Sequence, residues 1–336
     1  MIAVTIGAAG ALVPPLPRAP KASPSRPLSD NARGGTPSTA ATFTVSVNKV
    51  NDAPVISVGN GNSAAVSLLE SATTNLSANG SLTVRDPDLL NTVTATKVNV
   101  AATGTTAGLT SNNAALLAML TLSSGNVISS AQTSGTINWS FDSGLETFEY
   151  LASGESLVLT YTIKATDSVP SDSVSQTIVV TINGASSSPV ITGGPDVALL
   201  NETNAGLSTN GSLTVTDPDL ANTLTPSIAV VASGTTSSAT PTNADLRAMF
   251  TVTPGDSLAG SRTQASHALN WSFNSVSEAF DYLADGESLV LTYTVTVTDD
   301  TTPTNLSDSE TVTITIRGTN DAPTITNGPD AASLAE

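Results

Sequence analysis

One nine-residue stretch of this chain, Gly-Glu-Ser-Leu-Val-Leu-Thr-Tyr-Thr, occurs twice without a change, at Gly154–Thr162 and at Gly286–Thr294. In the first copy Leu157, Leu159 and Tyr161 fall on one face of an extended chain, and the threonines fall on the other. This alternation is typical of an antiparallel strand with one face on a core and the other in water. The stretch therefore predicts the same central strand in two repeated β-domains.

The residues on both sides of this stretch recur too, so the repeat is a whole domain rather than a short motif. Matching positions lie from 131 residues apart (Ser81 and Ser212) to 135 residues apart (Pro54 and Pro189). Such a period suits a string of domains rather than a solenoid. The pattern predicts a disordered Pro- and Ser-rich leader at 1–42, the last strand of a truncated preceding repeat at 43–53, a first repeat at 54–188, a second at 189–322 and the start of a truncated third at 323–336.

Each repeat carries about seven short segments with strand patterning, separated by clusters of Gly, Asn, Asp and Ser. These segments predict an all-β, two-sheet sandwich in each repeat. One short helix is expected at Asn113–Met119 and again at Asn243–Met249, with the Asn that opens each segment as its N-cap. In the first repeat the expected strands lie near 55–59, 66–69, 81–86, 92–100, 135–142, 156–167 and 174–183.

The composition excludes several kinds of site. The chain has no Cys and one His, which excludes disulfides, thiolate metal sites and His-based metal clusters. The formal net charge is −17, and residues 51–336 hold six Lys and Arg against 27 acids, so their net charge is 6 − 27 = −21. An acidic body argues against nucleic acid and anionic membrane surfaces as partners, and it favours divalent cations.

The N-terminus leaves three readings open. The apolar start Met1–Val13 has three interpretations: a secretory signal peptide that lacks a basic n-region, a disordered leader, or the product of a misplaced start codon. No apolar run in the chain reaches the roughly 20 residues of a transmembrane helix, so membrane insertion is not expected.

Paired acids end one strand of each repeat. Asp86-Pro87-Asp88 recurs as Asp217-Pro218-Asp219, and alternate residues of an extended chain point the same way, ~6.5 Å apart. Two carboxylates so placed repel each other unless a positive charge lies between them, and Ca²⁺ accepts oxygen ligands from irregular loops. The alternative is a strand-ending turn, since Pro removes a ladder donor and Asp favours turns. The residues alone leave both readings open.

Four further acids recur at matching positions of the two repeats. Asp167 and Asp299 follow the central strands, and Glu70 and Glu202 follow an early strand. Each is a candidate cation ligand or a solvated turn residue. A different candidate site is the motif Asn-Trp-Ser-Phe, whose Trp139 and Trp271 are either core residues or a stacking platform for a glycan.

Together these motifs resemble the VCBS repeat, a cadherin-like sandwich found in tandem in very large bacterial surface and secreted adhesins. The resemblance rests on the Asn-Asp-Ala-Pro boundaries, Ser-Leu-Thr-Val-x-Asp-Pro-Asp, the Trp-x-Phe strand and Leu-Ala-x-Gly-Glu-Ser-Leu-x-Leu-Thr-Tyr-Thr, and it covers about residues 43–336. It implies tandem cadherin-like or immunoglobulin-like Greek-key β-sandwiches, each with one short helix.

The resemblance also implies Ca²⁺ between repeats, where the ion stiffens each junction. On that reading the upper end of a repeat supplies Asp86, Asp88 and Asp167, or Asp217, Asp219 and Asp299. The linkers supply Asn51, Asp52, Asn320 and Asp321, and the lower ends supply Glu70 and Glu202, with Glu155 and Glu287 as further acids. Between the two repeats Ser186-Ser187 replace the Asn-Asp linker. We therefore expect weak Ca²⁺ binding, in or above the ~10⁻⁴–10⁻³ M range of extracellular modules.

These features predict a non-catalytic structural and adhesive region of a large bacterial surface or secreted protein. Its expected location is the extracellular space or cell surface, and its expected partners are neighbouring repeats of the same chain and a cell-surface or matrix protein or glycan. The alternative is a carbohydrate- or protein-binding module attached to a larger secreted protein. An enzyme is not expected, because the sequence has no Gly-x-Ser-x-Gly elbow, phosphate-binding Gly loop or zinc motif.

Overall fold

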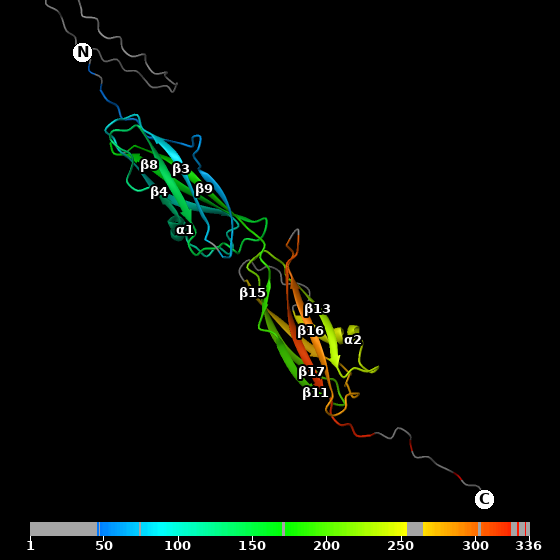
Figure 1. Ribbon diagram of the computed structural model, residues 1–336. Coiled ribbons are helices and arrows are strands. Elements are labelled where there is room, and N and C mark those ends of the chain that lie inside the picture. The colour runs from blue at the N-terminus through cyan, green and yellow to red at the C-terminus, as the bar shows by residue number, and fades with distance from the viewer. Residues whose placement is uncertain are drawn as a thin grey trace, which may run out of the picture. The chain divides into compact units, whose positions relative to one another are not determined.

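The computed structural model describes residues 46, 48–73, 75–169, 172–253, 265–301, 304–323, 328 and 333. They form two β-sandwiches, one after the other along the chain (Figure 1). The expectation of an all-β chain built from repeated sandwiches is confirmed. The predicted leader lies outside the described residues, as does most of Phe43–Val47 and of the segment after Pro323. The predicted domain boundaries stay predictions.

The first sandwich packs a four-stranded sheet against a five-stranded one. The smaller sheet has the order β1-β3-β7-β5, and the larger has the order β2-β9-β8-β4-β6, in which β2 and β9 run parallel and the other pairs antiparallel. The elements are β1 (Val55–Ser57), β2 (Ala65–Leu69), β3 (Ser77–Arg85), β4 (Val93–Gly104), α1 (Asn113–Met119), β5 (Leu120–Leu122), β6 (Asn126–Ile128), β7 (Ser134–Asp142), β8 (Ser156–Asp167) and β9 (Ser173–Asn183).

The second sandwich repeats this plan with the sheet orders β10-β12-β15-β14 and β11-β17-β16-β13. Residues 254–264, between β14 and β15, lie outside the described residues. The elements are β10 (Val190–Thr192), β11 (Asp196–Asn201), β12 (Ser208–Thr216), β13 (Thr225–Gly234), α2 (Asn243–Ala248), β14 (Phe250–Thr253), β15 (Ser266–Asn274), β16 (Ser288–Thr298) and β17 (Ser307–Arg317). No helix in the described part of the chain is long and apolar enough to span a membrane.

The repeated nine-residue stretch forms the central strands β8 and β16, and its alternation is borne out. Every second residue of each strand is buried, and the threonines between them are half-buried. At the centre of each core the hydroxyl of Tyr161 donates to the Leu116 carbonyl at 2.9 Å, and that of Tyr293 donates to the Leu246 carbonyl at 2.8 Å. Each bond satisfies a carbonyl of the short helix, which ties the helix to the sheet.

The short helices are present, but the predicted N-caps are one residue late. The capping side chains are those of Asn112 and Thr242, which accept from the amides of Ala115 and Asp245. The second helix also ends one residue earlier than expected, at Ala248. The sequence pattern missed the strands β5, β6 and β14, because three or four residues are too few to show a period.

The chain changes sheets early in each repeat. In the second repeat β10 pairs antiparallel with β12, and after residues 193–195 the chain continues as β11, which runs parallel to β17. β11 is therefore an edge strand of the β11-β17-β16-β13 sheet, beside β17 in Figure 1. Because Glu202 directly follows β11, this edge strand also positions one of the predicted acids.

Candidate metal centres

The two Asp-Pro-Asp segments bury their carboxyl groups. Asp217 and Asp219 are 4% and 2% exposed, and Asp86 and Asp88 are buried likewise. In each segment the second Asp donates its backbone N–H to Oδ1 of the first, at 2.9 Å. The turn that ends the strand therefore also holds the two carboxylates, so the turn reading and the ligand reading of this motif are compatible.

The central strand of the second sandwich adds a third acid to this end. Asp299 is 2% exposed, and its Oδ1 accepts from the amides of Thr301 and Leu306 at 3.1 and 2.8 Å. The buried Asn222 lies among them and donates through Nδ2 to Asp219 at 3.3 Å and to the Thr301 hydroxyl at 3.1 Å. The structure thus brings the predicted Asp217, Asp219 and Asp299 to one end of the sandwich, and it adds Asn222, which the sequence did not single out.

Several of these buried carboxylates keep an oxygen atom without a hydrogen-bond partner. In the described residues these atoms are Asp86 Oδ2, Asp217 Oδ2, Asp219 Oδ1, Asp299 Oδ2, Glu70 Oε2 and Glu202 Oε2. Burying a charged oxygen without compensation is costly, so native proteins pair such atoms, protonate them or place them on a metal. All six atoms belong to residues that the sequence predicted as cation ligands.

The acid–base properties of this end follow from the same burial. Burial raises the pKa of Asp217 to about 6, and the charge of Asp299 adds to the rise. Burial also raises the pKa of Asp219 to about 7, with further contributions from the charges of Asp217 and Glu70. The pKa of Glu70 is raised above all by burial and then by the charge of Glu149. The site therefore disfavours its own ionised form until a positive charge is present.

The linker between the sandwiches bonds to the acids through its backbone. The Ser187 N–H donates to Asp219 Oδ2 at 2.9 Å, and the Ala185 N–H donates to Glu70 Oε1 at 3.1 Å. At the start of the first sandwich the Asp52 N–H makes the same contact with Asp88, at 2.6 Å. Ser187 therefore stands in the position of Asp52. The Ser186-Ser187 linker keeps the backbone contacts and lacks the carboxylate, as the sequence indicated.

In the first sandwich the side chain of linker residue Asn51 pairs with one upper acid, Asp167. Asn51 Nδ2 donates to Asp167 at 2.8 Å and to Asp172 at 3.2 Å, and Asn51 Oδ1 accepts from Asn91 Nδ2 at 2.6 Å. The side chain predicted as a linker ligand thus serves as a hydrogen-bond donor to a predicted ligand. In the second sandwich Ser186 replaces this Asn, and Asp299 Oδ2 is one of the oxygens without a partner.

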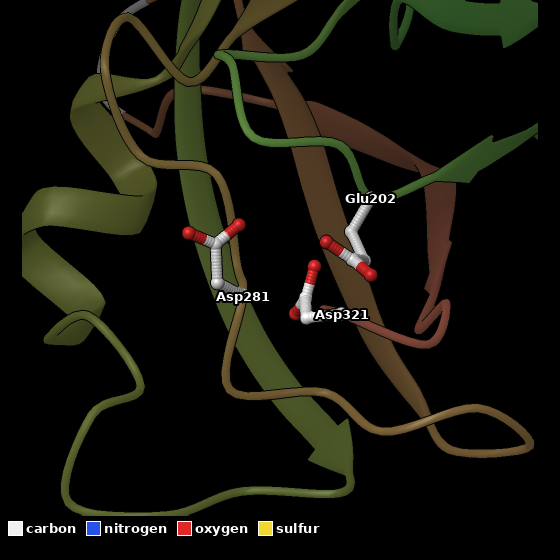
Figure 2. A group of neighbouring side chains, drawn as sticks. All are labelled: Glu202, Asp281 and Asp321. Carbon is white, nitrogen blue, oxygen red and sulfur yellow. The ribbon is translucent and has the colours of Figure 1, made fainter. Parts of the chain in front are cut away.

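A third group of acids lies at the lower end of the second sandwich. One carboxylate oxygen from each of Glu202, Asp281 and Asp321 lies within 4.8 Å of the others. Figure 2 shows the three side chains grouped together. Glu202 is 1% exposed, and its Oε1 accepts from both the amide and the hydroxyl of Thr319 at 2.6 Å. The pKa of Asp321 is raised by desolvation and by the charges of Glu202 and Asp281. Asn320 is exposed.

Asp281 escaped the sequence analysis, although a signal for it exists. An acid directly follows the recurring Phe of each repeat, as Glu149 after Phe148 and as Asp281 after Phe280. Both Phe residues have a positive φ, 61° and 64°, and both are fully buried. This uncommon turn puts the ring into the core and the next residue at the end of the sandwich.

Two further groups proposed from the sequence make contacts within their own sandwich. Glu155 and Glu287 accept the amides of Ala152 and Ala284, three residues earlier, and so brace their own turns. Trp139 and Trp271 are each 2% exposed, and their indole N–H groups donate to Ser63 O and Asp196 Oδ2 at 2.8 Å. The hypothesis of an exposed Trp platform for a glycan is wrong, because both rings are in the cores.

Comparison with protein-family models finds no match, and comparison with curated proteins finds none either. Among solved structures the chain is similar to cadherin-like and immunoglobulin-like domains. The human protocadherin-24 EC1-2 structure is 15% identical over 81% of this chain and 100% of that one, with a TM-score of 0.30. Titin domains Z1Z2 in complex with telethonin are 14% identical over 80% and 99%, with a TM-score of 0.29. Zebrafish RET cadherin-like domains 1 to 4 are 13% identical over 66% and 42%, with a TM-score of 0.26.

Proposed function

We propose that this chain is a structural and adhesive spacer whose cadherin-like sandwiches are stiffened by Ca²⁺ at their ends. The observation that carries the proposal is the set of buried carboxylate oxygens that lack a hydrogen-bond partner in both repeats. Ca²⁺ takes ~6–8 oxygen ligands from irregular loops and tolerates uneven geometry, which matches donors supplied by turns and strand ends. Bound there, the ion supplies the positive charge that these carboxylates lack.

Two groups of residues fit the ion best. At the junction between the repeats these are Glu70, Asp217, Asp219 and Asp299, and at the lower end of the second sandwich they are Glu202, Asp281 and Asp321. At the start of the first sandwich the ligands would be Asp86 and Asp88, with Asn51, Asp52 and Asp167 beside them. Because Ser187 offers an amide where Asp52 and Asp321 carry a carboxylate, we expect the middle junction to bind Ca²⁺ weakly.

The sequence resemblance supports a finer assignment to the VCBS repeats of bacterial surface and secreted adhesins. An acidic, Cys-free chain with oxygen-ligand sites for Ca²⁺ suits the extracellular space, where this ion is plentiful. The partners we propose are neighbouring repeats of the same chain and a cell-surface or matrix protein or glycan. The burial of Trp139 and Trp271 removes the observation that favoured a glycan site on the sandwich itself.

Calorimetric titration of the chelated full chain with Ca²⁺ tests this proposal, and two linker variants sharpen it. Ser187→Asp restores the missing carboxylate beside Asp219, and Ser188→Asp adds the same charge one residue further along. We expect Ser187→Asp to tighten Ca²⁺ binding about tenfold, equivalent to ~1.4 kcal/mol, and Ser188→Asp to change it little. Absence of binding at millimolar Ca²⁺ in both the wild type and Ser187→Asp would overturn the calcium mechanism.

Small-angle scattering of the same samples tests the stiffening. We expect Ca²⁺ to increase the maximum dimension and narrow the distribution of shapes. If Ca²⁺ binds without changing the scattering, the serine linker uncouples the two sandwiches, and the ions act within each repeat.

A further inference from the structure

The edge strand β11 carries apolar side chains on both faces. Ala198 and Leu200 pack on the core of the second sandwich, whereas Val197 and Leu199 point outward and are 72% and 55% exposed. Exposed edge strands are normally protected by a charged side chain, a Pro or a bulge within the strand. The interior of β11 has none of these, since its one charged residue is Asp196 at the start.

The outward apolar pair is specific to the second repeat. Val197 lies opposite Thr313 of β17, and at the matching position of the first repeat Ala65 of β2 lies opposite Val179 of β9. Leu199 lies opposite Thr315, and its counterpart in the first repeat, Ser67, lies opposite Thr181. The fold therefore accepts small or polar residues at these positions, so core packing does not require Val197 and Leu199.

The outer edge of β11 also presents backbone groups. The Val197 N–H donates to its neighbour's carboxylate, Asp196 Oδ1, at 3.0 Å, so it points away from β17. Residues two apart on a strand direct their amides to the same side, which places those of Leu199 on the outer edge as well. Within the described ranges no strand pairs with this edge. An edge of this kind accepts an extended strand.

We propose that β11 pairs antiparallel with β11 of a second copy of this chain, across a two-fold axis that passes between the Ala198 residues of the two copies. In this register Val197 of each copy lies opposite Leu199 of the other. Both residues direct their backbone to the outer edge, so each opposed pair exchanges its two N–H···O=C bonds at a Cα separation of ~5.5 Å. On pairing, the Val197 N–H exchanges its Asp196 Oδ1 acceptor for the Leu199 carbonyl of the other copy. The two apolar pairs lie on the same face of a continuous sheet and cover each other.

Charge does not oppose a second copy at this place. The chain has a formal net charge of −17, so two copies repel over most of their surface. The residues paired in line with Val197 on the next three strands of the sheet are Thr313, Thr292 and Val231, and all three are uncharged. In the proposed register the two Asp196 carboxylates lie four residues apart along the strand, ~14 Å, which exceeds the Debye length of ~8 Å at physiological salt. A single paired edge is a small contact, so the dimer is weak and depends on concentration.

Sedimentation velocity of the full chain over a range of concentrations tests this pairing. The wild type is expected to form a dimer at high concentration, and Leu199→Lys is expected to weaken it at least ~tenfold, because a charge replaces half of each apolar pair. Ser67→Lys, at the matching position of β2, is the control and should leave the dimer unchanged. A wild-type chain that stays monomeric, or a dimer insensitive to Leu199→Lys, would refute the proposal.

Because the chain contains no Cys, engineered cysteines report the register directly. Val197→Cys combined with Leu199→Cys places thiols opposite each other at ~5.5 Å between Cα atoms, within the ~4.4–6.8 Å range of disulfides. Mild oxidation should give disulfide-linked dimers of this variant and not of Ala65→Cys combined with Ser67→Cys. Equal yields from both variants would mean random collision and would contradict the proposed edge.

Discussion

Replacing Asp219 by Asn should stabilise the chelated protein and destabilise the Ca²⁺-loaded protein. Asp219 is 2% exposed, and its pKa of about 7 lies well above the ordinary 3.8. At 1.36 kcal/mol per pKa unit this difference corresponds to ~4 kcal/mol of disfavoured ionisation at pH 7.5. Because the end of the sandwich borders water, solvent screening reduces the figure to ~1–2 kcal/mol. Asn removes that cost and keeps an acceptor for the Ser187 amide.

The assay is thermal unfolding of the full chain by calorimetry, followed at the transition of the second sandwich. With chelator at pH 7.5 we expect Asp219→Asn to raise the Tm by ~3–8 °C. At pH 5 the folded wild-type carboxyl is protonated, so the gain should be smaller, and it should vanish below about pH 4, where the carboxyl of the unfolded chain is protonated as well. With saturating Ca²⁺ the sign should reverse, because the variant has lost a ligand. Asp285→Asn, which removes an exposed carboxylate, is the control and should show none of these effects.

One result would refute this reasoning. If Asp219→Asn lowers the Tm equally with chelator and with Ca²⁺, then Asp219 acts as a turn residue through the Ser187 contact, and its buried charge imposes no cost.

Three further predictions follow from the same structure. In the chelated chain the pKa values of Asp217 and Asp219 are raised, so protonation of these two carboxyls contributes stability that is fully present below about pH 4 and is lost as pH rises through about 6 to 7. The Tm of the second sandwich should therefore fall between pH 5 and 8 with chelator. A flat profile would contradict the raised pKa values. Gly80→Ala should cost ~1–3 kcal/mol in urea unfolding, because its Cβ would overlap the Trp139 ring, whereas Gly59→Ala, with Asn62 Nδ2 3.7 Å away, should cost much less. Tyr161→Phe and Tyr293→Phe should each cost ~1–3 kcal/mol in the same assay, since each leaves a buried helix carbonyl unsatisfied; no loss in either variant would show that water replaces the hydroxyl.

The repeat made the fold predictable. A stretch that returns unchanged, with Leu157, Leu159 and Tyr161 on one face, identifies the central strand and its buried side without any tertiary information. The short strand β5 could not be predicted, because three residues are too few to show a period. The parallel pairing of β2 with β9 could not be predicted either, because the partners lie more than a hundred residues apart and are chosen by packing. The N-caps at Asn112 and Thr242 were missed by one residue because adjacent polar residues compete for the same role.

The candidate metal ligands were predictable where acids recur at strand ends, as with Asp217 and Asp299. Their burial was not, since an Asp in a turn is usually solvated. The recurring acid after Phe148 and Phe280 is visible in the sequence, but the place of Asp281 beside Glu202 depends on the positive φ of Phe280, which no sequence pattern of L-residues indicates. The donor role of Asn51 toward Asp167 depends likewise on a contact across 116 residues.

The serine linker has a mechanical consequence. Flexible joints in a chain of rigid bodies act in series, so their compliances add and the softest joint determines how the whole chain responds to a small pulling force. On the proposed mechanism, replacing Asn-Asp by Ser186-Ser187 places such a joint between the two sandwiches while both cores stay intact. The dipeptide Ser186-Ser187 would then determine how far the spacer bends at a given Ca²⁺ concentration. The position of this dipeptide along the chain would determine where the spacer bends first.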